Sequence, residues 1–105
     1  MEEVVLVSGA RTPIGTFGGS LKDVAAAELG KTAIRCALER AGVDPALVDD
    51  VILGEGLYGG GVVARHAAIT AGLTDVPGLA QNRHCAAGLA AVQGAAASIR
   101  AGWTS

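Results

Sequence analysis

The chain has 105 residues and a formal net charge of −2 at pH 7, and 50% of its residues are hydrophobic although only 3% are aromatic. This length allows one small domain. High apolar content with low net charge excludes a disordered chain, and eight scattered Lys and Arg residues leave no basic surface for nucleic acid. No apolar run reaches the ~20 residues of a membrane span, so neither nucleic acid nor a membrane is expected as a partner.

Many residues of the chain have a small side chain or none. Ala occurs 21 times and Gly 16 times, which predicts a core in which backbones pack closely. The acidic start, Met1-Glu2-Glu3, lacks the basic residues of a secretory signal and indicates a cytoplasmic protein. In that compartment Cys36 and Cys85 are expected to be reduced thiols.

The first half of the chain predicts a strand, a loop and a helix. Residues 4–8 (VVLVS) are a continuous apolar run, typical of a strand covered on both faces. Residues 9–19 are rich in glycine and contain Pro13, so we expect a loop. Residues 24–41 carry apolar side chains at helical spacing, and Gly42 follows as a C-cap.

The second half predicts two strands, each followed by a helix. Asp44-Pro45 supplies an N-cap and a first-turn proline for a short helical turn. Strands are expected at residues 51–53 and 77–81, and helices at 62–71 and 85–100. Alternating strands and helices indicate an α/β fold with a largely parallel sheet.

The last predicted helix is unusual because residues 86–99 contain no charged side chain. A helix that is apolar all round is expected to be buried all round. A chain of 105 residues is too short to cover both sides of it. We therefore expect the chain to be an incomplete domain, which either meets another chain over this helix or belongs to a longer polypeptide.

Cys85 is the leading candidate for a functional group. It follows the predicted turn Asn82-Arg83-His84 and is expected in the first turn of the last helix, where unpaired N–H groups and the helix dipole favour an anion. These groups favour the nucleophilic thiolate. The small residues 86–88 would let a substrate reach the sulfur and amides able to hold an oxyanion. A buried, inert cysteine is the alternative, and on residue chemistry alone it is the commoner one.

The other polar candidates are expected to be structural. Cys36 lies within a predicted helix, away from any helix end. His84 adjoins Cys85, but neighbouring side chains there project in different directions, so a catalytic pair is not expected. His66 is expected at the surface, and Asp49-Asp50 in a solvated turn. Two His and two Cys without close spacing predict no metal site.

The glycine-rich loops also have a structural interpretation. Neither residues 15–19 nor residues 59–61 have the spacing of a phosphate-binding loop, so tight turns and close backbone contacts are expected. Arg11 follows the first predicted strand and could bind an anion, although an ion pair within the structure is favoured.

Three segments together resemble the N-terminal part of the thiolase family (acetyl-CoA C-acyltransferases). The first is residues 11–20 (RTPIGTFGGS), the second residues 51–54 (VILG), and the third residues 82–89 (NRHCAAGL). Ala64-Arg65 and Ala67-Ala68 add to the match. An RTPxG start combined with NRxC is far more specific than either motif alone, and the resemblance extends over nearly the whole chain.

The resemblance implies an α/β fold of a particular kind, the thiolase αβαβα sandwich, with residues 1–105 as an incomplete N-terminal domain. It implies that Cys85 accepts an acyl group from a 3-ketoacyl-CoA or acetyl-CoA as a thioester, and that the Cys85 N–H contributes to an oxyanion hole. A second CoA, or the enolate of a second acetyl-CoA, then receives the acyl group. Acyl-CoA and CoA would be substrates, no cofactor would be permanently bound, and a homo-oligomer (dimer or tetramer) would be expected.

The family pattern also has parts that this chain lacks. The activating histidine, a second cysteine and the CoA-binding loop belong to later parts of family members, so the isolated chain is expected to be inactive. Ala87 stands where Ser is frequent, and the loop before Val63 is shorter than in many members, which leaves the acyl chain length open. The alternatives are a β-ketoacyl synthase of the same fold and a non-catalytic thiolase-like binding subunit in which Cys85 is only structural.

Overall fold

A computed structural model describes residues 3–57 and 62–104 of the chain. The glycine run at residues 59–61, for which we predicted close backbone contacts, therefore lies outside the described residues. The elements follow one another in the order α1 (Ala26–Ala41), the 3₁₀ turn η1 (Pro45–Leu47), β1 (Val51–Gly54), α2 (Val63–Thr70), β2 (Gly78–Gln81) and α3 (Ala87–Arg100).

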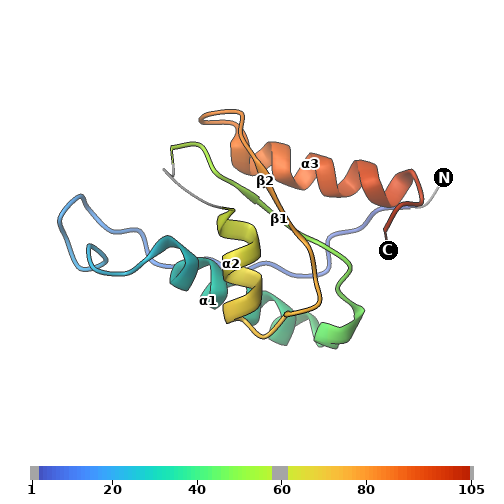
Figure 1. Ribbon diagram of the computed structural model, residues 1–105, viewed down its shortest axis with the longest axis horizontal. Coiled ribbons are helices and arrows are strands. Elements are labelled where there is room, and N and C mark those ends of the chain that lie inside the picture. Colours follow the sequence, from blue (N-terminus) through green and yellow to red (C-terminus); the bar gives the residue numbers. More distant parts are fainter. Residues whose placement is uncertain (1–2, 58–61, 105) are drawn as a thin grey trace.

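The two strands form a parallel pair, as the alternation of strands and helices predicted. Val51 lies opposite Gly78 and Gly54 lies opposite Gln81. Parallel neighbours need a crossover connection, and α2 provides it, lying between β1 and β2 in the sequence and beside them in space (Figure 1). The carboxyl ends of both strands consequently lie at the same edge of the sheet.

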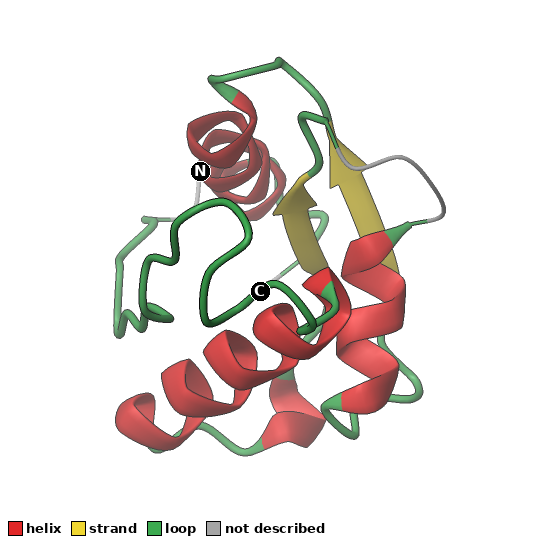
Figure 2. Ribbon diagram, turned by 90° about the vertical axis from the view of Figure 1, so that its left-hand side faces the viewer, coloured by secondary structure: helices red, strands yellow, loops and turns green. Residues whose placement is uncertain are grey.

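The strands lie between two helical layers. Helix α3 covers one face, whereas α2 packs on the other and α1 packs against α2, an arrangement visible in Figures 1 and 2. Successive strand residues point to opposite faces. Val51 accordingly joins the buried cluster with Ala64 and Ala68 of α2, whereas Gly54 contacts the backbone of α3. The described part of the chain is thus a three-layer α/β unit.

The core is made of small side chains, as the composition predicted. Ala64, Ala67 and Ala68 of α2 are completely buried. A Cβ atom built on Gly30 of α1 would lie 3.0 Å from the Cβ of Ala67, and one built on Gly78 would overlap the backbone of α2. Glycine and alanine at these contacts let the helices and strands approach closely.

The predicted turns are confirmed with small shifts in the boundaries. Helix α1 begins at Ala26, two residues later than expected, and ends before Gly42, whose φ of 66° gives the left-handed C-cap. The Asp44 carboxylate accepts a hydrogen bond of 2.9 Å from the Ala46 N–H, as an N-cap should. In the glycine-rich loop, the Gly19 N–H donates to the Thr16 carbonyl oxygen at 2.8 Å, closing a tight turn.

The strand predicted at residues 4–8 was wrong. The segment is extended but pairs with no strand among the described residues, and Leu6 is 87% exposed. A β-strand forms only where a neighbour satisfies its N–H and C=O groups, and the sheet of the described residues consists of β1 and β2 without this segment. The segment instead lines an open apolar groove of about 700 Å³ together with α3, and the Arg40 guanidinium donates to the Gly9 carbonyl oxygen at 3.0 Å.

Helix α3 is covered on one face only, so complete burial does not hold within this chain. Ala87, Ala90 and Ala91 are buried, whereas Leu89 is 65% exposed and Val92 is 52% exposed. The described residues supply one sheet face for this helix, as expected for a chain too short to cover both sides. No helix in the described part of the chain has the length and apolar character needed to cross a membrane.

Candidate active site

Cys85 lies in the turn that joins the carboxyl end of β2 to α3, and it is exposed. The expectation that it belongs to the first turn of the helix was wrong by two residues, because α3 begins at Ala87 with Ala86 as its N-cap. His84 has a left-handed φ of 50°, so a helix cannot include it, and the first helical residue is Ala87. The thiol thus stands in front of the helix rather than within it.

The start of α3 offers backbone N–H groups beside this turn. The N–H groups of Ala86 and Ala87 are already used, donating to the carbonyl oxygens of Arg83 and His84 at 3.0 and 3.1 Å. Within residues 3–57 and 62–104, those of Cys85, Gly88 and Leu89 donate no hydrogen bond. Unpaired N–H groups at a helix start carry the positive end of the helix dipole. Such groups can stabilise an oxyanion that develops beside them.

No hydrogen bond joins the Cys85 thiol to a side chain of the described residues. His84 is exposed, and its backbone N–H donates a hydrogen bond of 2.9 Å to the Asn82 side-chain oxygen. The hydrogen bond that closes this turn therefore comes from the His84 backbone and not from its imidazole ring. In the part of the chain that the structure describes, no group of three His, Cys, Asp or Glu residues could hold a metal ion.

The remaining candidate residues lie elsewhere. Cys36 is half-buried in the middle of α1, as expected, and His66 is exposed on α2. The Asp50 carboxylate accepts from the Val51 N–H at 2.8 Å and so caps the start of β1. Arg11 is exposed, and the ion pair that we favoured for it is not found among the described residues.

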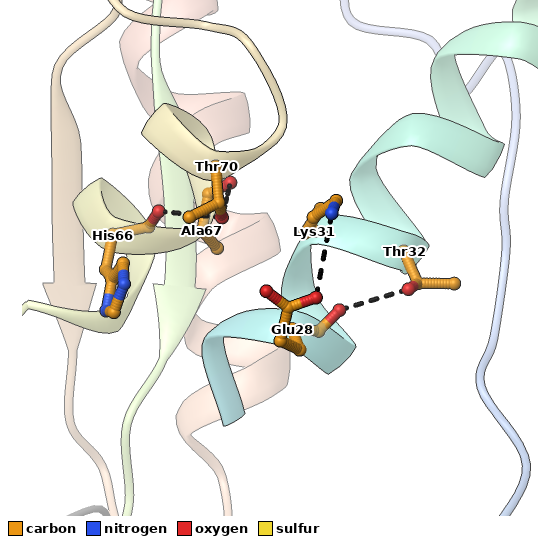
Figure 3. A network of polar contacts seen from close by, with 6 residues as sticks. All are labelled: Glu28, Lys31, Thr32, His66, Ala67 and Thr70. Atoms are coloured by element: carbon orange, nitrogen blue, oxygen red, sulfur yellow. Dashed lines mark hydrogen bonds and ion pairs between the residues drawn. The ribbon is translucent and has the colours of Figure 1, made fainter. Parts of the chain in front are cut away.

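The polar contacts around His66 serve the helices themselves. The Thr70 hydroxyl donates to the backbone carbonyl oxygens of His66 and Ala67 at 3.0 and 3.1 Å (Figure 3). On α1, Lys31 forms an ion pair of 3.6 Å with Glu28. These are local contacts one helical turn apart, and they bring no polar group towards Cys85.

Three features of the strand ends and the helix starts were not predicted from the sequence. Gly54 and Gly56, at and just after the end of β1, pack directly on the backbone of the Cys85 turn and of α3. Asn82 caps the turn, and an Asn two residues before a turn residue is a recognisable signal for that role. The Glu55 carboxylate accepts the Val63 N–H at 2.9 Å and so caps α2 from eight residues away, a spacing that no local capping pattern would indicate.

Comparison with known proteins identifies the class of the chain. The thiolase N-terminal domain family matches residues 4–105, and the crystal structure of the Bacillus anthracis acetyl-CoA acetyltransferase superposes with a TM-score of 0.91. That structure is 41% identical, and the match covers 95% of this chain and 26% of that one. The α/β unit described above is therefore part of the thiolase fold, and the chain belongs to the thiolase family.

Curated relatives agree with this family. An acetyl-CoA acetyltransferase of Cupriavidus necator is 51% identical, with 97% of this chain matched to 27% of that protein. An acetyl-CoA acetyltransferase of Pseudomonas aeruginosa is 46% identical over the same shares of each chain. The chain thus spans about a quarter of the length of the curated relatives it matches. Membership of the thiolase family favours the thiolase interpretation over a β-ketoacyl synthase.

The different surroundings of the two cysteines predict different alkylation rates. Cys85 is exposed in a turn, whereas Cys36 is half-buried within α1. Reaction at Cys36 is slowed because its side chain is partly covered, and burial makes cysteines inert. We expect iodoacetamide at pH 7 to modify Cys85 at least about 10-fold faster than Cys36, as measured by peptide mapping of the folded protein. Equal rates would contradict this geometry, and a protein unfolded in denaturant provides the control.

Proposed function

We propose that the complete protein, meaning these 105 residues joined to the rest of a thiolase polypeptide, is a thiolase-type acyltransferase in which Cys85 accepts the acyl group. One observation carries the proposal: an exposed thiol lies in front of a helix start with unused N–H groups, within a segment of the thiolase family. The names of the relatives, acetyl-CoA acetyltransferases, favour an acetyl group and CoA as the substrates.

In the first proposed step, a base removes the proton from the Cys85 sulfur, and the sulfur attacks the carbonyl carbon of an acyl-CoA thioester. The new C–S bond forms as the carbonyl becomes an oxyanion, and the bond to the CoA sulfur then breaks as CoA leaves and takes up a proton. The unused Cys85 N–H is suited to hold that oxyanion, because a preorganised donor needs no reorganisation during the reaction.

In the second proposed step, the acyl group leaves Cys85 for an acceptor. After the first step above, the acceptor is the enolate carbon of acetyl-CoA, and the product is acetoacetyl-CoA. In the cleavage direction the Cys85 sulfur instead attacks the 3-keto carbon of a 3-ketoacyl-CoA, the bond between C2 and C3 breaks, and C2 takes up a proton so that acetyl-CoA leaves. A CoA sulfur then accepts the remaining acyl group from Cys85. Either way the Cys85 thiol is regenerated by reprotonation, so CoA is a co-substrate and no permanently bound cofactor is needed. We assign the base, the second proton-transfer group and the CoA-binding loop to the remainder of the polypeptide.

The proposal includes the cellular setting expected from the sequence and the resemblance. The complete protein is proposed to be a cytoplasmic homo-oligomer that acts on soluble CoA thioesters. Size-exclusion chromatography with light scattering measures its assembly, and a monomer would remove that part of the proposal.

The test is acyl capture on the complete protein. Incubation with acetyl-CoA should add one acetyl group to the peptide that contains Cys85, and Cys85→Ala should abolish this adduct and lower thiolysis of acetoacetyl-CoA by at least ~10³-fold. Cys36→Ala, the matched control, should retain both. The 105-residue chain alone should show no turnover. Full activity of the Cys85→Ala variant would overturn the role of Cys85, whereas an unmutated complete protein with neither adduct nor thiolysis would support the non-catalytic binding subunit.

A further inference from the structure

The turn that carries Cys85 has an unusual backbone. Five residues connect the end of β2 at Gln81 to the start of α3 at Ala87. Among the described residues, His84 is the one non-glycine residue with a positive φ, at 50°. Side chains with a Cβ atom rarely adopt this left-handed conformation, although histidine tolerates it better than most. Such residues persist where the surrounding structure determines them, often beside a functional group.

The side chain of Asn82 stabilises this conformation. Its Oδ1 atom accepts a hydrogen bond of 2.9 Å from the His84 N–H, two residues along the chain. An Asn in this position closes a turn with its side chain in place of a backbone carbonyl. The next two hydrogen bonds, from the Ala86 and Ala87 N–H groups to the Arg83 and His84 carbonyl oxygens, then complete the connection to α3.

The end of β1 restrains the turn from the other side. A Cβ atom on Gly56 would lie 2.9 Å from the His84 carbonyl oxygen, and one on Gly54 would lie 2.7 Å from the carbonyl carbon of Ala87 and the nitrogen of Gly88. These distances are far below van der Waals contact, so the turn lies directly against the β1 backbone. His84 therefore has the Asn82 amide on one side and glycine backbone on the other.

We infer that Asn82 is a positioning residue for Cys85: by holding His84 in the left-handed conformation, its side-chain oxygen sets where the Cys85 sulfur and N–H point. This inference rests on the proposed function of Cys85 and adds a role for a residue that touches neither the sulfur nor a substrate. Misplacement of a reacting group by about 1 Å costs on the order of 100-fold in rate, so the turn needs little distortion to matter.

The experiment compares three variants of the complete protein: Asn82→Ala, Asn82→Asp, and Asn82→Ala combined with His84→Gly. The alanine variant removes the acceptor and should lower kcat about 10- to 100-fold with KM nearly unchanged. The aspartate variant keeps an oxygen at the same position and should remain close to wild type. In the double variant, the glycine that replaces His84 adopts φ > 0 without a partner, and most of the lost kcat should return relative to Asn82→Ala.

The outcomes separate this inference from the proposed function. If the unmutated protein forms no acetyl adduct on Cys85, the proposed function fails. If that adduct forms normally and Asn82→Ala has an unchanged kcat, or Asn82→Asp is as impaired as Asn82→Ala, the positioning role is overturned. Failure of the double variant to improve on Asn82→Ala likewise contradicts it, because release of the His84 backbone is then not the reason for the loss.

Discussion

Gly54→Ala is expected to lower the free energy of unfolding by about 3 kcal/mol, at the upper end of what overpacking costs. The added methyl group would lie 2.7 Å from the Ala87 carbonyl carbon and the Gly88 nitrogen. These are backbone atoms, which cannot rotate away as a side chain can, so α3 itself must move. Because Cys85 lies two residues before this helix, acyl transfer should fall as well.

Gly88→Ala is the matched control for stability, since it adds the same methyl group on the other side of this contact. Nothing lies within 4 Å of a Cβ atom on Gly88, and Ala is favoured over Gly within a helix by about 0.5–1 kcal/mol. Chemical unfolding of the complete protein should therefore show strong destabilisation for Gly54→Ala only. Equal midpoints for the two variants would contradict the close approach of β1 and α3.

The sequence was most informative where a local pattern determines structure. The 3.6-residue periodicity and Gly42 located α1, Asp44 located the 3₁₀ turn, and the short apolar runs located β1 and β2. Residues 4–8 show the limit of this reasoning. Their composition suits a strand, but a strand exists only with a hydrogen-bonding neighbour, and among the described residues no such neighbour is present.

The place of the candidate Cys85 in the fold was predictable only approximately. Cys85 was singled out because it follows a strand-to-helix turn and was expected in the first turn of the helix, whereas the structure places it in the turn, two residues before α3. Its exact position depends on the left-handed His84 and on contacts with Gly54 and Gly56, which lie about 30 residues earlier in the chain. A contact between residues so far apart leaves no periodic pattern, so reasoning from neighbouring residues could not find it.

Ala90→Asp is the second substitution with a large expected effect. Ala90 is 7% exposed on the face of α3 that packs against the strands, and no polar partner is provided there for a charge. Burial of an unpaired carboxylate costs several kcal/mol. The favourable interaction of an acidic group with the start of a helix contributes only about 0.3–1 kcal/mol. Burial therefore dominates, and the 105-residue chain should lose its helical circular-dichroism signal at temperatures where the unmutated chain retains it.

Leu89→Asp, one position earlier, distinguishes the two faces of α3. Leu89 is 65% exposed in this chain, so its replacement should change the stability of the 105-residue chain by less than about 0.5 kcal/mol. In the complete protein, however, the absence of charge along residues 86–99 predicts that the second face is covered too. There Leu89→Asp should abolish soluble expression or lower Tm by many degrees.

Lys31→Asp controls for the charge change in both settings. Lys31 is partly exposed on α1, where its partner is Glu28 (Figure 3). An exposed ion pair contributes about 0–1 kcal/mol, so this variant should remain folded in the chain and in the complete protein alike. If Leu89→Asp and Lys31→Asp gave similar melting temperatures in the complete protein, the exposed face of α3 would be a solvent-facing surface, and its lack of charge would need a cause other than burial.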